Sequence, residues 1–164
     1  MSVLVEDYLS KKNGETYRGI SKKFNMRSSW GAEAQLLSYG CIIEKLFIPD
    51  PSGNLADIML GLKGLDEYMA SGSNHGSIVG RSANRIKGAK YKINGVEYQA
   101  PDNDGGNNLH GGSPSFQNVF WDGKVITEEE ANDYIKASGI EGIPAADGEG
   151  ILFSYTSPDG ACGF

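Results

Sequence analysis

The sequence has little of what several large classes of function require. It contains two cysteines, Cys41 and Cys162, in 164 residues, and neither forms a CxxC pair or lies near a histidine at metal-ligand spacing. Lysine and arginine number 15 against 21 aspartates and glutamates, and no basic run offsets the net charge of −6. Because nucleic-acid binders need a basic face, this balance argues against a phosphate-backbone partner.

Long apolar runs are also missing. No stretch approaches the roughly 20 apolar residues that a membrane-spanning helix needs. Residues 1–7 lack a basic segment followed by an apolar one, so no secretory signal is predicted. Cys41 lies in the apolar run 39–43, where a buried free thiol is expected. Together these features predict a reducing compartment, the cytoplasm.

What the sequence does contain is typical of one globular domain with short strands. Hydrophobic residues make up 39% and charged residues 22%, and 164 residues suffice for a sizeable core. The 23 glycines mostly separate short apolar segments, which indicates an all-β fold of strands joined by turns.

The clearest element is a hairpin over residues 90–98. Its centre, Asn94-Gly95, tolerates the positive φ that a two-residue type I′ turn requires at both positions. The implied register places Ile93 opposite Val96, with the lysine and glutamate that flank them paired on the other face.

Three further segments have clear local signals. Ala34 to Ile48 is predicted to be a strand pair or one bent strand, broken at Gly40, and residues 151–156 form another strand. Thr127 and Glu130 form a capping box, so a helix is predicted over 128–138. A helical turn is expected at 65–69.

The densest polar region, residues 74–112, holds both histidines of the chain, His75 and His110. The predicted hairpin lies between them. A hairpin brings the segments before and after it side by side, so distant polar residues are expected to meet at one end of a sheet.

These motifs resemble a known family. Gly80-Arg81-Ser82-Ala83-Asn84-Arg85-Ile86, the Asn-Gly hairpin and Leu109-His110-Gly111-Gly112 occur in the same order in aldose 1-epimerases (galactose mutarotases). The segments 40–50, 57–68 and 157–164 are also similar. The likeness covers the chain except the stretch around 123–149.

The resemblance implies a large twisted antiparallel β-sandwich. Residues 1–164 would supply its N-terminal portion, as part of a single domain with a predicted insertion at 123–149. The family's second active-site histidine, its catalytic glutamate and a sugar-binding aspartate lie beyond the segment that matches. We therefore expect the natural protein to continue past Phe164, or a second polypeptide to complete the fold, since half a sandwich leaves an open edge and an uncovered apolar face.

By this resemblance His110 is the first active-site histidine and contacts the sugar near its ring oxygen. Imidazole suits acid–base work because its ordinary pKa lies near neutrality. The alternative is a structural histidine beside a glycine turn.

By the same resemblance, Asn84 and Arg85 are implied to bind sugar hydroxyls. The alternative for Arg85 is a salt bridge that holds a turn. Arg81 is interpreted as structural.

Other polar features are assigned structural roles. His75 is interpreted as a surface or packing histidine, and Trp121 as part of the core. Residues 102–107 superficially suggest a calcium loop but lack the ligand spacing, so a polar turn is predicted. Glu128-Glu129-Glu130 is explained by helix capping.

The function implied is interconversion of the α and β anomers of a hexose such as galactose or glucose. No cofactor and no metal are implied, and the partner is a small aldose sugar, with a phosphorylated hexose left open. The alternative is a non-catalytic carbohydrate-binding or degenerate fragment that holds a sugar but lacks the base.

Overall fold

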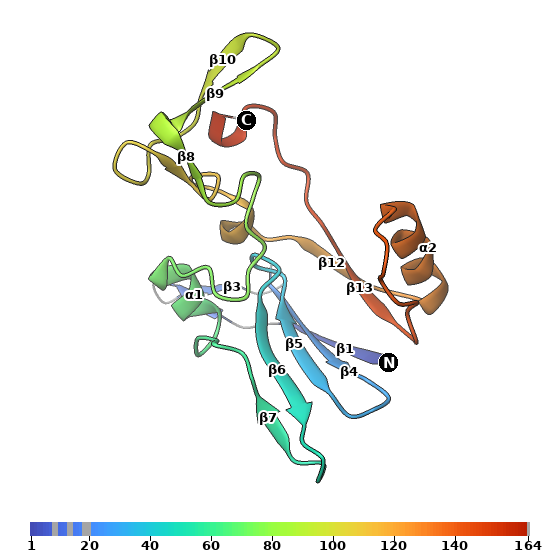
Figure 1. Cartoon of the computed structure of the whole chain (residues 1–164). Coiled ribbons are helices and arrows are strands. Elements are labelled where there is room, and N and C mark those ends of the chain that lie inside the picture. The colour runs from blue at the N-terminus through green and yellow to red at the C-terminus, as the bar shows by residue number, and fades with distance from the viewer. Residues whose placement is uncertain (8–9, 13–14, 18–20, 164) are drawn as a thin grey trace.

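The computed structural model describes residues 1–7, 10–12, 15–17 and 21–163. Its largest element is a five-stranded antiparallel sheet in the order β1-β4-β5-β6-β7, which forms the lower part of the molecule (Figure 1). The strands are β1 Ser2–Asp7, β4 Lys22–Arg27, β5 Glu33–Leu37, β6 Ile43–Pro49 and β7 Leu55–Asp57. The short strands β2 Ser10–Lys12 and β3 Glu15–Tyr17 form a ribbon of their own.

The predicted break at Gly40 separates β5 from β6. These strands pair antiparallel with a bulge at Gln35/Leu36, which confirms the strand-pair prediction for 34–48. Gly40 has a φ of 61°, and a Cβ there would lie 2.6 Å from the carbonyl oxygen of Gln117. The close approach lets the backbone N–H of Gly40 donate to the carbonyl of Val119, at 2.9 Å. This turn therefore joins the sheet to the segment that follows the polar region.

The core lies beside this turn, where the sheet meets helix α1 Leu65–Ser71. It is a buried cluster of aliphatic and tyrosine side chains, onto which Phe120 packs from the later part of the chain. The buried members are Leu37, Tyr39, Ile42, Leu65 and Tyr68. The predicted helical turn at 65–69 is thus a helix that extends two residues further, until Gly72 adopts a left-handed φ of 64°.

The predicted hairpin is strands β9 Lys90–Ile93 and β10 Val96–Gln99, at the top of the molecule (Figure 1). Its register places Ile93 opposite Val96, as predicted, and Asn94 and Gly95 both have positive φ, 50° and 83°. Glu97 bonds Lys90 diagonally at 3.1 Å. The hairpin also packs against the end of the chain, because the hydroxyl of Tyr91 donates to the carbonyl of Gly163.

A second ribbon runs from the centre of the molecule and consists of β12 Asp122–Ile126 and β13 Gly150–Ser154 (Figure 1). The strand predicted at 151–156 ends at Ser154 because its partner β12 begins opposite that residue, at Asp122. Helix α2 covers Glu128–Ser138, as predicted, and connects the two strands.

The remaining elements are short: β8 Arg85–Ile86, β11 Asn108–Leu109, and 3-10 turns at Lys87–Ala89, Phe116–Asn118 and Ala161–Gly163. The fold is thus mostly antiparallel β with two helices, which confirms the predicted class. Phe164, part of one motif discussed above, lies outside the described residues. In the part of the chain that the structure describes, no helix has the length and apolar character needed to cross a membrane.

Candidate functional site

The site forms where two polar segments meet below the β9–β10 hairpin. Strand β8 pairs antiparallel with β11, with Ile86 opposite Asn108 and Arg85 opposite Leu109. The side chain of Asn108 is fully buried and donates to the carbonyl of Pro101 at 2.9 Å. The segment that carries Asn84 and Arg85 is therefore held directly beside the segment that carries His110, as the intervening hairpin predicted.

His110 and Asn84 form a reciprocal pair. The backbone N–H of His110 donates to the carbonyl of Asn84 at 3.0 Å, and the backbone N–H of Asn84 donates to Nδ1 of His110 at 3.1 Å. Both residues have left-handed backbone conformations, with φ of 55° and 59°. Because Nδ1 accepts a backbone hydrogen bond, the neutral imidazole carries its proton on Nε2. The ring is thus fixed in orientation and in tautomer, and Nε2 is its remaining donor.

Arg85 is held by an aspartate that the sequence did not assign to the site. Its Nε donates to Oδ2 of Asp104 at 2.6 Å, and its Nη1 lies 3.4 Å from Oδ1 of Asn84. The arginine side chain is 55% exposed. The salt bridge predicted as the alternative for Arg85 is therefore present, while much of the guanidinium still faces solvent.

His110 lines a cavity of about 230 Å³. Most of the side chains around it are neutral hydrogen-bonding groups, and Asn84 and Arg85 lie next to this lining and not within it. The lining residues are Gly72, Asn74, Asn103, Leu109, His110, Gly112, Ser113, Gln117 and Asn118. Among the described residues the lining includes no carboxylate.

Gln117 is the lining residue whose side chain bonds the backbone of His110. Its Nε2 donates to the carbonyl of His110 at 3.1 Å, and the side chain is buried. Its Oε1 is buried without a hydrogen-bond partner among the residues described. Several other buried polar atoms in the described chain are likewise unpaired, Oδ1 of Asn108 among them, so this oxygen does not by itself indicate a ligand.

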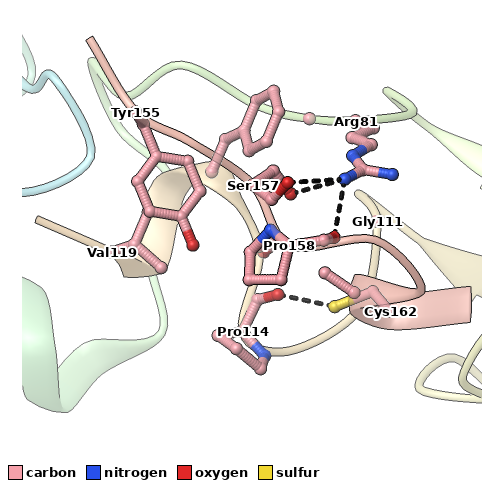
Figure 2. A pocket seen from close by; sticks show the side chains of 12 residues that line it. Arg81, Gly111, Pro114, Val119, Tyr155, Ser157, Pro158 and Cys162 are labelled. Carbon is pink, nitrogen blue, oxygen red and sulfur yellow. Dashed lines mark hydrogen bonds between the residues drawn. The ribbon is translucent and has the colours of Figure 1, made fainter. Parts of the chain in front are cut away.

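Arg81 lies in a separate, smaller cavity of about 90 Å³, lined largely by Phe116, Tyr155 and prolines (Figure 2). Its Nη2 donates to the carbonyl and hydroxyl of Ser157, at 3.3 and 2.8 Å, and to the carbonyl of Pro158, at 2.9 Å. These bonds tie the turn at 157–160 to the loop before β8, which is the structural role predicted for Arg81.

The remaining candidates lie outside the His110 cavity. His75 is exposed and does not line the His110 cavity. Trp121, predicted to be part of the core, is instead half-buried and lies outside the core cluster: it packs edge-on against Phe116, and its indole N–H donates to the Phe116 carbonyl at 2.9 Å. Glu130 and Thr127 form the capping box of α2, with bonds of 2.8 and 3.2 Å.

The sequence interpretation assigned none of the amide or hydroxyl side chains of the cavity lining to the site, and it also missed Asp104. Asn103 and Gln117 line the cavity, and Asp104 contacts Arg85. Asn103 and Asp104 belong to the segment interpreted as a polar turn; it is such a turn, but it lies against the site. Gln117 has no local signal, since a single glutamine in a loop implies neither burial nor a ligand.

Comparison with known proteins gives a consistent result. The sequence model of the aldose 1-epimerase family matches residues 22–145. The galactose mutarotase of Mus musculus is 36% identical over 126 residues, which are 77% of this chain and 36% of the relative. The aldose 1-epimerase of Streptococcus thermophilus is 29% identical over 138 residues, 80% of this chain and 39% of the relative. The chain thus spans little more than a third of the length of the curated relatives it matches.

Two solved structures share the fold. The galactose 1-epimerase from Lactobacillus acidophilus NCFM superimposes with a TM-score of 0.61 at 24% identity, covering 76% of this chain and 34% of that one. The aldose epimerase homologue from C. elegans gives a TM-score of 0.60 at 30% identity, covering 65% and 35%. The mostly antiparallel β fold is therefore the galactose mutarotase-like fold. With three quarters of its length matched by the family model, the chain belongs to the aldose 1-epimerase family.

Proposed function

We propose that an aldose sugar binds at His110, partly in the cavity that this residue lines and partly over the adjoining Asn84 and Arg85, so that all three residues contact it. The observation that carries this proposal is the reciprocal pairing of His110 with Asn84, which leaves Nε2 as an oriented donor at a cavity lined by neutral polar groups. Sugar hydroxyls both donate and accept, so they match a lining of amides and hydroxyls.

We further propose that the activity is interconversion of hexose anomers, as the names of the relatives suggest. Mutarotation needs a base to remove the proton of the anomeric hydroxyl and an acid to protonate the ring oxygen. With its proton on Nε2, a neutral His110 can act on the acid side by donating a hydrogen bond to the ring oxygen. The base would come from sequence outside this segment, either a continuation of the chain or a second polypeptide that completes the sandwich. The cytoplasmic location stays a prediction from sequence.

The alternative is a carbohydrate-binding segment without catalysis. The observation that favours it for the chain alone is that the described lining of the His110 cavity contains no carboxylate to act as a base. Two measurements separate the proposals. Calorimetric titration with galactose or glucose reports binding, and optical rotation of freshly dissolved α-anomer reports equilibration. Binding with equilibration no faster than in buffer would favour the alternative, and the absence of binding would refute both.

His110→Asn tests the role of the histidine. Asparagine tolerates the left-handed backbone at this position, so the fold should persist. In any preparation that catalyses mutarotation, we expect the rate to fall by about two orders of magnitude, as for the loss of an acid–base group. Circular dichroism checks the fold. His75→Asn, at the exposed histidine, is the matched control, and an unchanged rate in His110→Asn would remove this residue from the mechanism.

A further inference from the structure

We infer that Asp104 is a positioning residue: it holds the guanidinium of Arg85 in its ligand-binding orientation before a sugar arrives. The inference rests on the proposed sugar site. Its basis is the 2.6 Å contact between Arg85 Nε and Asp104 Oδ2, from a carboxylate that is 30% exposed to an arginine that is 55% exposed.

The loop that carries Asp104 is closed by its own hydrogen bonds. The backbone N–H of Asp104 donates to the carbonyl of Asn107 at 3.1 Å, and the Asn107 N–H donates back at 3.2 Å. Oδ1 of Asp102 accepts the N–H of Gly106 at 2.8 Å. None of these bonds uses the carboxylate of Asp104, so the loop presents that group with its geometry already set.

Three further hydrogen bonds fix this loop to the site. Oδ1 of Asn107 accepts the N–H of Gly88 at 3.2 Å, just after β8. The side chain of Asn103 accepts the N–H of Leu109 at 2.8 Å and donates to its carbonyl at 2.9 Å, next to His110. The carboxylate is therefore anchored to both strands that carry the candidate ligands.

Asp104 contacts the guanidinium of Arg85 at Nε, and this position decides which donors stay available to a ligand. Arginine has a fork of five donors on a flexible stem, and Asp104 uses the Nε edge. Fixing that edge sets the plane of the fork and leaves Nη donors for hydroxyls. A ligand then meets an arginine that is already ordered, which reduces the entropy lost on binding.

An exposed ion pair by itself contributes little to stability. The chain offers a matched example: Lys90 and Glu97 lie 3.1 Å apart with exposures of 56% and 51%, on the β9–β10 hairpin. Glu97→Ala removes a comparable pair from an element that supplies no residue to the His110 cavity. It is the control for a merely structural effect.

The experiment compares Asp104→Ala, Asp104→Asn and Glu97→Ala in the full 164-residue chain. The first readout needs no sugar: the side-chain ¹H–¹⁵N signal of Arg85 Nε, identified by its loss in Arg85→Lys. In the unaltered chain this proton should exchange slowly with water. In Asp104→Ala the proton should exchange as fast as that of a free arginine, and in Asp104→Asn at an intermediate rate. In Glu97→Ala the exchange rate should equal that of the unaltered chain.

The second readout is the affinity for galactose. Asp104→Ala should weaken it by about three- to tenfold, Asp104→Asn should restore part of the loss, and Glu97→Ala should leave it unchanged. In an Arg85→Ala background, Asp104→Ala should have no further effect.

Two results would overturn the inference: unchanged exchange of the Arg85 Nε proton in Asp104→Ala, or an equal loss of affinity with and without Arg85. If the unaltered chain binds no sugar, the proposed function fails, and the exchange measurement still decides whether Asp104 positions Arg85.

Discussion

At the scale of single residues, Cys41 shows how burial sets chemistry. It lies in the turn between β5 and β6 and is only 4% exposed. Burial disfavours the thiolate and raises the pKa of the Cys41 thiol to about 12. Burial also raises the pKa of Cys162, where nearby Arg81 opposes the shift. Thiol reactions need the thiolate, so both cysteines are slow nucleophiles at neutral pH, and Cys41 the slower.

We therefore expect an alkylating reagent at pH 8 to modify Cys162 well before Cys41 in the native chain. The measurement is peptide mass spectrometry over time, with the Cys162→Ser variant used to follow Cys41 alone. Modification of Cys41 should become fast only in denaturant. Equal rates for the two thiols in the native chain would contradict the buried assignment.

The raised pKa of the Cys41 thiol also makes the free energy of unfolding depend on pH. The unfolded thiol loses its proton near pH 9.0, while the folded thiol keeps it up to about 12. The unfolded state thus binds fewer protons in this window, and the free energy of unfolding should fall as pH rises through it. Urea unfolding of Cys41→Ala against the unaltered chain measures this: the variant should lose less stability between pH 9 and 11.

At the scale of elements, helix α2 depends on its N-terminal capping box. Thr127 Oγ1 accepts the N–H of Glu130, and Glu130 Oε2 accepts the N–H of Thr127. Only Ala131 of this helix is buried, so packing contributes little and the cap matters more. Thr127→Ala should destabilise the helix by about 1 kcal/mol, seen as faster amide hydrogen exchange over 128–138.

The control for this prediction is Glu129→Gln, which removes the charge of a neighbouring carboxylate outside the capping box. Exchange over 128–138 that is equally fast in both variants would show that the box does not stabilise this helix.

The hydrogen bond from Thr127 lowers the pKa of Glu130, so helix α2 should lose its protection from hydrogen exchange as the pH falls below the ordinary glutamate pKa of 4.5.

Local signals predicted the elements whose bonds are formed within a few residues. The Asn94-Gly95 turn fixes the register of its hairpin, and the capping box fixes the start of α2. Pairing between distant strands has no such signal. Strand β1 bonds β4 across some 20 residues, and β8 and β11 contribute two residues each. Strands that short have no period to detect in the sequence.

At the scale of the whole molecule, the main sheet leaves apolar surface exposed. In the described structure β7 pairs only with β6 and is an edge strand, and the segment after it exposes Ile58 at 61% and Leu60 at 73%. Edge strands with apolar neighbours are sites of association. This is the surface on which we propose that a completing segment lies.

The isolated 164-residue chain is therefore expected to self-associate and to bind a hydrophobic dye. Light scattering should give a mass above the 17.6 kDa of one chain, and Leu60→Lys with Ile58→Lys should lower both signals. Ile140→Lys, at an isoleucine that is 63% exposed in the loop after α2, is the matched control. A stable 17.6 kDa monomer that binds no dye would contradict the proposed completing surface.

The insertion predicted at 123–149 stays a prediction from sequence.

The sequence by itself determined the elements that have local signals, and the family resemblance. The hairpin, α2, the strand pair around Gly40 and the order of motifs from Gly80 to Gly112 all follow from residues close together in the chain. Only the tertiary structure decided which polar groups meet. The tautomer of His110, the partner of Arg85 and the unpaired oxygen of Gln117 depend on polar groups brought together from separate loops. Hydrogen bonding acts over about 3 Å, and no local pattern specifies which distant groups come that close.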